Sequence, residues 1–234
     1  MGIPTIAKDI TTFFYGGVAN LPLVIAGTAL ILGLMTANYA MLFFLFGFII
    51  LVPISTSIVN IATEFILKIL GFGDYFMIKP NDLCNLVIPF ASAATTSTPQ
   101  FVFSSLWMAM VSFFLGYMFA NALALMGREV DAPDDQKEKA AKQANVRKSQ
   151  AMTSILSIVL AGVVFMAIRL LYASCDRLAG AIPTVLLFGG FGFIWYKALA
   201  SVGQDRLSDL FGIANRLLAP GALANQPVAC MPVA

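Results

Sequence analysis

The chain has 234 residues, of which 59% are hydrophobic and only 11% are charged. This composition is not that of a soluble protein, and it places the chain in a bilayer. The formal net charge of +2 excludes a nucleic-acid-binding protein driven by bulk charge, and a sequence without histidine excludes histidine-based catalytic triads, metal sites and pH switches.

The 14 basic and 12 acidic residues leave four uncharged windows, at 10–63, 83–127, 149–168 and 178–196. Each window is about as long as, or longer than, the roughly 20 residues that a helix needs to cross a hydrocarbon core. We therefore predict an all-α, polytopic membrane protein with about five transmembrane helices, a cytoplasmic helical extension and an amphipathic C-terminal helix. The bundle is expected over 1–204 and the tail over 205–234.

The first window is long enough for two spans, near 18–35 and 39–61, with Thr36–Asn38 as their connection. Pro53 lies inside the second span and predicts a kink. The helix must continue past Pro53, because the run before it covers only about 21 Å. The hydroxyls of Ser55, Thr56 and Ser57 are suited to satisfy the carbonyl that the proline leaves without a donor. A broken-helix ion site is the alternative interpretation.

The remaining spans are expected near 101–126, 151–172 and 182–199. Small residues on the third and fifth of the five spans predict close helix packing, and the candidates are Gly116, Ala120, Gly189 and Gly190. Gly192 on the fifth span is interpreted in the same way. The stretch 83–91 is apolar as well, and its alternatives are an interfacial segment, a re-entrant segment or an extra pass. An extra pass through the membrane would reverse the direction in which every later span crosses it.

Basic residues predict the orientation. With five spans, nine lysines and arginines fall on one side and four on the other, which puts the C-terminus and the 127–150 loop in the cytoplasm. Charged residues over 131–150 predict a helix that runs into the fourth span, either as a solvated stalk or as a docking surface. The tail repeats apolar residues at helical spacing and is expected on the membrane, on its own bundle or on a partner. Candidate partner contacts in these two segments are Lys137, Lys139, Lys142, Leu207, Leu210 and Phe211.

Ionisable residues are almost absent from the predicted spans. Arg169 and Lys197 lie near span ends, where long side chains can reach the headgroups, and the alternatives for Arg169 are a pair with Asp176 or a place in the bundle interior. Asn60 and Asn121 are expected to form interhelical hydrogen bonds. The three cysteines, Cys84, Cys175 and Cys230, are isolated in sequence, so no metal site is predicted, although one Cys84–Cys175 disulfide is compatible with the topology.

Two blocks of sequence carry a resemblance. The stretch Thr98-Pro99-Gln100-Phe101, with 106–108 and 113–122, resembles membrane proteins of large double-stranded DNA viruses of the chlorella-virus and related giant-virus kind, and the tail 209–218 with 227–230 is similar to the ends of such proteins. The resemblance implies an integral protein of the virion inner membrane, or of the host endoplasmic reticulum during assembly, with minor capsid proteins as partners. It brings no catalytic residues.

These observations predict a non-enzymatic structural or scaffolding membrane protein without a cofactor, whose partners are the lipid bilayer and other virion proteins. A small channel or transporter subunit that uses the Pro53 helix is the alternative from another class. A membrane enzyme is a third interpretation, which lipid turnover by the purified protein would reveal.

Overall fold

The computed structural model describes residues 16–78, 100–127, 137–172, 176–203 and 210. Its long helices are α2 (Leu21–Met35), α3 (Tyr39–Phe46), α4 (Val52–Ile69), α5 (Leu106–Met126), α6 (Lys137–Ala167) and α7 (Leu178–Gly203). A π-helical turn, η1 (Gly47–Leu51), joins α3 to α4, and a second one, η5 (Ile168–Tyr172), follows α6. After the short 3-10 turn η2 (Gly73–Phe76), strand β1 (Met77–Ile78) pairs antiparallel with β2 (Gln100–Phe101).

Four helical segments of the described chain are long and apolar enough to cross a membrane: Tyr39–Ile69, Leu106–Met126, Lys148–Leu171 and Leu178–Val202. The predicted all-α polytopic membrane fold is therefore confirmed. The first of the five expected spans differs, because α2 has only 15 residues and rises about 22 Å, less than the roughly 30 Å of a hydrocarbon core. The third differs at its start, since Phe101 belongs to β2 and α5 begins only at Leu106.

Helices α3 and α4 form one continuous segment of 31 residues, which passes Pro53 through η1. In this wider turn the Val52 N–H donates to the carbonyl of Gly47, five residues back. The Thr56 hydroxyl donates to Val52 O at 2.8 Å and the Ser57 hydroxyl to Pro53 O at 3.0 Å. The sequence predicts that these hydroxyls bind the carbonyl that Pro53 leaves without a donor. The hydroxyls of Thr56 and Ser57 bind the carbonyls of Val52 and Pro53 instead. The backbone thus accommodates Pro53 by one π turn.

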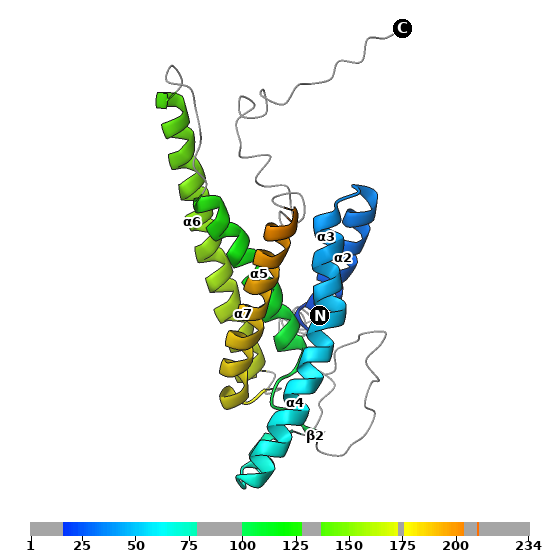
Figure 1. Ribbon diagram of the computed structural model, residues 1–234. Helices are drawn as coiled ribbons and strands as arrows, with labels where there is room; N and C mark the ends of the chain where they lie inside the picture. Colours follow the sequence, from blue (N-terminus) through cyan, green and yellow to red (C-terminus); the bar gives the residue numbers. More distant parts are fainter. Residues whose placement is uncertain (1–15, 79–99, 128–136, 173–175, 204–209, 211–234) are drawn as a thin grey trace, which may run out of the picture.

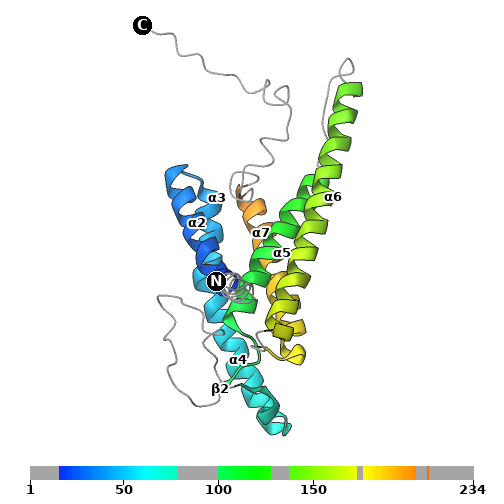
Figure 2. The ribbon, with the colours of Figure 1, turned by 180° about the vertical axis from the view of Figure 1, so that it is seen from behind.

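Helix α5 lies at the centre of the bundle and packs against α7, α6, α4 and α2 (Figures 1 and 2). Its contact with the α3 segment is aromatic: Phe44, Phe48, Phe113 and Tyr117 are all 0% exposed. The ring centroid of Phe44 lies 5.1 Å from that of Tyr117 and 6.0 Å from that of Phe113. Interlocked rings at such distances fill the space between the two helices completely enough to exclude solvent.

Glycines determine how closely α5 and α7 approach. A Cβ atom at Gly116 would collide with the backbone of Gly189, and one at Gly192 would collide with the carbonyl of Phe113. Ala120 is 0% exposed and lies in the same core. Gly190, in contrast, has no heavy atom within 4 Å of its Cβ direction and does not take part in this contact. Gly192, which the sequence also marks for close packing, makes the second contact with α5.

The charged segment from Lys137 and the expected fourth span form a single helix, α6, of 31 residues. In Figure 1 its N-terminal part extends well beyond the ends of α5 and α7. Only 6% of its most apolar stretch is buried inside the protein, whereas 61% of the corresponding stretch of α5 is buried. Apart from the face that packs on α5, most of α6 within the membrane is therefore left for lipid to cover.

Several sequence expectations fall outside the described part of the chain. They include 83–91, the three cysteines and the tail residues Leu207 and Phe211, and the side chains of Lys137, Lys139 and Lys142 are not described either. Leu210 is described: it is 2% exposed, and its carbonyl accepts a hydrogen bond from Asn38 Nδ2 at 3.3 Å. At this residue the tail lies on its own bundle, beside the connection between α2 and α3.

Candidate functional site

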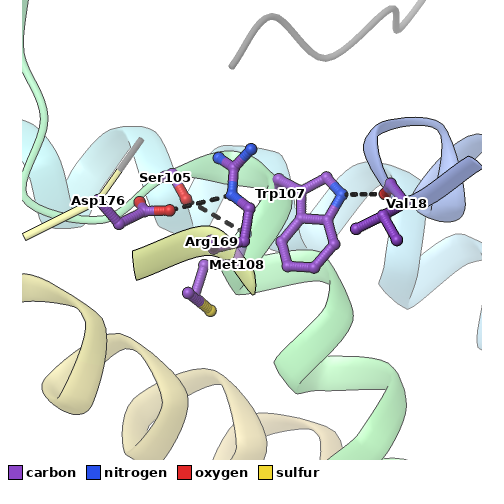
Figure 3. A network of polar contacts seen from close by, with 6 residues as sticks. All are labelled: Val18, Ser105, Trp107, Met108, Arg169 and Asp176. Carbon is purple, nitrogen blue, oxygen red and sulfur yellow. Dashed lines mark hydrogen bonds and ion pairs between the residues drawn. The ribbon is translucent and has the colours of Figure 1, made fainter. Parts of the chain in front are cut away.

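A cluster of polar contacts joins four separate parts of the chain at the end of the bundle where α5 begins (Figure 3). Val18 precedes α2, Ser105 and Trp107 mark the start of α5, Arg169 belongs to η5, and Asp176 precedes α7. We call this end of the bundle the Arg169 end. Ser105 begins α5 as its N-cap, because its hydroxyl oxygen accepts the Met108 N–H at 3.3 Å.

Trp107 connects the start of α5 to the residues before α2. Its ring is 2% exposed, and its indole N–H donates to the carbonyl of Val18 at 2.9 Å. A buried indole N–H needs an acceptor, and the Val18 carbonyl is the partner here. The hydrogen bond holds the residues just before α2 against the start of α5.

Arg169 and Asp176 form a buried ion pair. The Nε atom of Arg169 lies 3.1 Å from Oδ2 of Asp176, and the two side chains are only 4% and 5% exposed. The guanidinium carbon also lies 4.9 Å from the centroid of the Trp107 ring, within the range of a cation–π contact. Of the alternatives that the sequence left open for Arg169, the structure has the pair with Asp176. The pair carries no net charge, so it can be buried at this depth.

Asn60 on α4 holds the segment that leads into α5. Its Oδ1 accepts the N–H groups of Phe103 and Ser104, at 3.2 and 2.9 Å, and its Nδ2 donates to the Ser104 carbonyl at 2.9 Å. These backbone groups lie outside any helix and would otherwise lack partners. The sequence predicted an interhelical hydrogen bonder at Asn60. Its bonds go to a connecting segment instead, because α5 starts five residues later than expected. Asn121, the other candidate, is 3% exposed within α5.

A further polar contact connects α7 to α3, just before the π turn. The indole N–H of Trp195 donates to the Phe43 carbonyl at 3.3 Å, and the Trp195 ring stacks on Phe46 with a centroid distance of 6.4 Å. Gly47 makes room for this indole, since an added Cβ there would lie 2.7 Å from Nε1. Lys197 remains exposed on the same helix, with its ammonium group 5.8 Å from the centroid of the Phe193 ring.

These contacts have a common chemistry. They satisfy polar groups with a backbone carbonyl, a backbone N–H or an opposite charge, and the hydrogen bonds of Asn60, Trp107 and Trp195 join segments that are distant in sequence. Within the described residues, no group of three or more histidine, cysteine, aspartate or glutamate side chains is placed to hold a metal ion. The cluster at the Arg169 end is therefore arranged to hold helices together.

Comparison with known proteins adds no relative: no protein-family model, no curated protein and no solved structure matches the chain. The class follows from the fold itself, which is that of an all-α polytopic membrane protein. Its polar side chains connect the helices where these enter and leave the bundle.

Proposed function

We propose that the chain is a non-enzymatic structural membrane protein that anchors or scaffolds protein contacts at a membrane surface. The single observation that carries the proposal is α6, a helix of 31 residues whose apolar part has few fully buried residues and which continues beyond the bundle with a charged segment. A helix held in this way presents a rigid, charged rod at a fixed distance from the bilayer.

The composition of the charged segment 128–148 supports a protein partner. The segment contains six basic and five acidic side chains, a mixture that gives a lipid headgroup layer little net attraction. Its part on α6, 137–148, holds five of the basic and one of the acidic side chains, which suits complementary pairing with an acidic surface of another protein. Lys137, Lys139 and Lys142 are the proposed contacts on this segment.

The proposed location is the internal membrane of a large double-stranded DNA virus, with minor capsid proteins as partners. Its support is the resemblance of the 98–122 and 209–230 blocks to proteins of such membranes. The excess of basic residues on the side of α6 that carries the charged segment supports a cytoplasmic position for it. In a membrane derived from endoplasmic reticulum with that leaflet outward, the segment would face the capsid.

Cross-linking mass spectrometry of the intact particle or native membrane tests this proposal. We expect amine-reactive cross-links from Lys137, Lys139 and Lys142 to one abundant protein partner. Replacement of these three residues by glutamine should reduce recovery of that partner at least several-fold. Lys148→Gln serves as the matched control, since Lys148 lies on the same helix at the start of the membrane span. Equal recovery with both variants, or cross-links only to proteins on the opposite side, would reject the proposal.

A channel or transporter subunit is the second candidate, and η1 is the observation that favours it, because π turns are frequent at functional sites. The packing next to η1 opposes it: Phe48 and Phe113 are 0% exposed and meet with ring centroids 6.4 Å apart. Ion flux through liposomes containing the purified protein, abolished by Pro53→Ala and retained in Ser57→Ala, would favour the channel over the scaffold.

A further inference from the structure

Three helices line a partly open apolar groove, next to the Gly116–Gly189 contact and the Trp107 ring. Its volume is about 540 Å³, and its walls come from α5, α6 and α7. Glycines supply part of the wall, Gly162 from α6 and Gly189 and Gly190 from α7, and Ser112 is the one lining residue with a hydroxyl. All lining residues lie within spans that cross the membrane. Water at this depth would find almost no polar partner, so the groove requires an apolar occupant.

The groove has the depth of one leaflet. Along α5 it extends from Trp107, the second residue of the helix, to Phe119. Twelve residues of helix rise about 18 Å, and half of a hydrocarbon core is about 15 Å thick. The groove therefore starts at one membrane surface, at the Arg169 end, and stops close to the bilayer midplane.

Its width excludes a helix. A volume of 540 Å³ spread over about 18 Å of length gives a mean cross-section of about 30 Å². This volume counts room for the centre of a water-sized sphere, and on the same measure an α-helix about 10–12 Å across needs a cross-section of roughly 40–65 Å². A partner helix, or a helix of a second copy of this chain, therefore does not fit into the groove. A single extended hydrocarbon chain does.

We propose that this groove holds one acyl chain of a glycerophospholipid, drawn from the leaflet at the Arg169 end. The carbonyl end of the acyl chain lies near Trp107 and Met166, and its terminal methyl group lies near Phe119 and Ile158. The headgroup stays at the level of the buried Arg169–Asp176 pair, where the start of α5 meets the interface. The inference is independent of the proposed scaffold role, because it rests on the groove alone.

Photo-crosslinking in reconstituted bilayers tests the proposal. The full chain is placed in phosphatidylcholine vesicles with a phosphatidylcholine that carries a diazirine, either near the carbonyl or near the end of one acyl chain. Labelled residues are then located by mass spectrometry. We expect the first probe to label the Trp107 and Met166 part of the groove and the second probe to label the Phe119 and Ile158 part.

Filling the groove gives a matched comparison. Gly190→Leu places a side chain in the groove without a clash, because Gly190 has no heavy atom within 4 Å of its Cβ direction. Gly27→Leu on α2 is the control, since Gly27 is open in the same sense but lies outside the groove. We expect groove labelling to fall at least five-fold in Gly190→Leu and to stay unchanged in Gly27→Leu.

Gly162→Leu is a second filling variant, whose Cβ meets only Leu115 Cδ1 at 3.4 Å, and it should reproduce the loss. Thermal unfolding shows whether each variant keeps the fold. Undiminished groove labelling in folded Gly190→Leu and Gly162→Leu would overturn the proposal. So would labelling spread evenly over α6, or cross-links between two copies of the chain through the groove residues.

Discussion

Helices α5 and α6 are both apolar and both cross the membrane, yet 61% of the span of α5 is buried in the protein and only 6% of that of α6. The buried helix is the less hydrophobic of the two by mean hydropathy. In water this order would be surprising, because burial follows hydrophobicity there. In a bilayer the lipid chains are as apolar as leucine, so hydrophobicity does not decide which helix is enclosed.

Helix α5 differs from α6 because it carries small residues that allow close backbone contact and polar groups that need a hydrogen-bond partner from the protein. Gly116 permits backbone contact with Gly189, Ser105 and Trp107 fix the start of the helix, and Asn121 is buried along it. The membrane part of α6 presents mainly branched aliphatic side chains, such as Leu156, which is 69% exposed, and Leu160, which is 62% exposed. Close backbone approach and polar satisfaction therefore determine the centre of this bundle.

The largest effect should come from breaking the ion pair at the Arg169 end. Arg169→Leu leaves the Asp176 carboxylate buried without a partner, and we expect the free energy of unfolding to fall by about 3–5 kcal/mol. Denaturation of the purified protein in mixed micelles measures it. The double variant Arg169→Leu/Asp176→Leu should recover most of the loss, and Lys197→Leu, at an exposed lysine, should change little. A double variant as unstable as the single one would contradict the explanation.

The next effect tests the contact between α5 and α7. Gly116→Ala adds a Cβ against the Gly189 backbone, so the helices must separate, at a cost of about 1–3 kcal/mol. Gly27→Ala makes the same chemical change on α2, where the space is open. The unfolding midpoints of the two variants give the comparison. If they shift equally, the close approach does not stabilise the bundle.

A smaller effect is expected where α4 holds the segment before α5. Asn60→Leu removes three hydrogen bonds to Phe103 and Ser104, and we expect a loss of about 1–2 kcal/mol together with faster amide exchange at these two residues. Hydrogen-exchange mass spectrometry resolves the segment. Ser57→Ala, at an exposed hydroxyl of the same helix, should leave the exchange unchanged, and unchanged exchange in Asn60→Leu as well would refute the role of Asn60.

The smallest effect is predicted for the lipid-facing helix. Leu156→Ala on α6 should change stability by no more than about 0.5 kcal/mol, because lipid replaces the lost side chain. Leu125→Ala on α5, where the side chain is 5% exposed, should cost about 2 kcal/mol or more through the cavity that it leaves. Equal losses of stability at the two sites would contradict the conclusion that protein encloses α5 more than it encloses α6.

The positions of the spans could be predicted because lipid forbids charge over long stretches, and a map of charges locates such stretches directly. Helix ends were harder: Asn60 binds the backbone before α5, and β1 pairs with β2, so the third span starts at Leu106 instead of 101. Neither interaction has a local sequence signal.

The candidate packing glycines were partly identifiable. Gly189 and Gly192 are three residues apart and share a helix face, whereas Gly190 is turned away from it by about 100°. The sequence marks all three glycines for close packing, and periodicity alone separates Gly190 from the other two. The contact of Arg169 with both Asp176 and the Trp107 ring depends on how η5 turns towards α7, and that turn cannot be deduced from the order of residues.

The unbroken passage of the backbone through η1 has a consequence for the host membrane. The uncharged part of this segment, from Tyr39 to Thr63, is about 37 Å long, several ångströms more than an average hydrocarbon core of about 30 Å. A segment of this length is accommodated by tilting, by bending or by a surrounding bilayer that is thicker than average. Hydrophobic mismatch at this one helix thus gives the protein a built-in preference among membranes of different thickness.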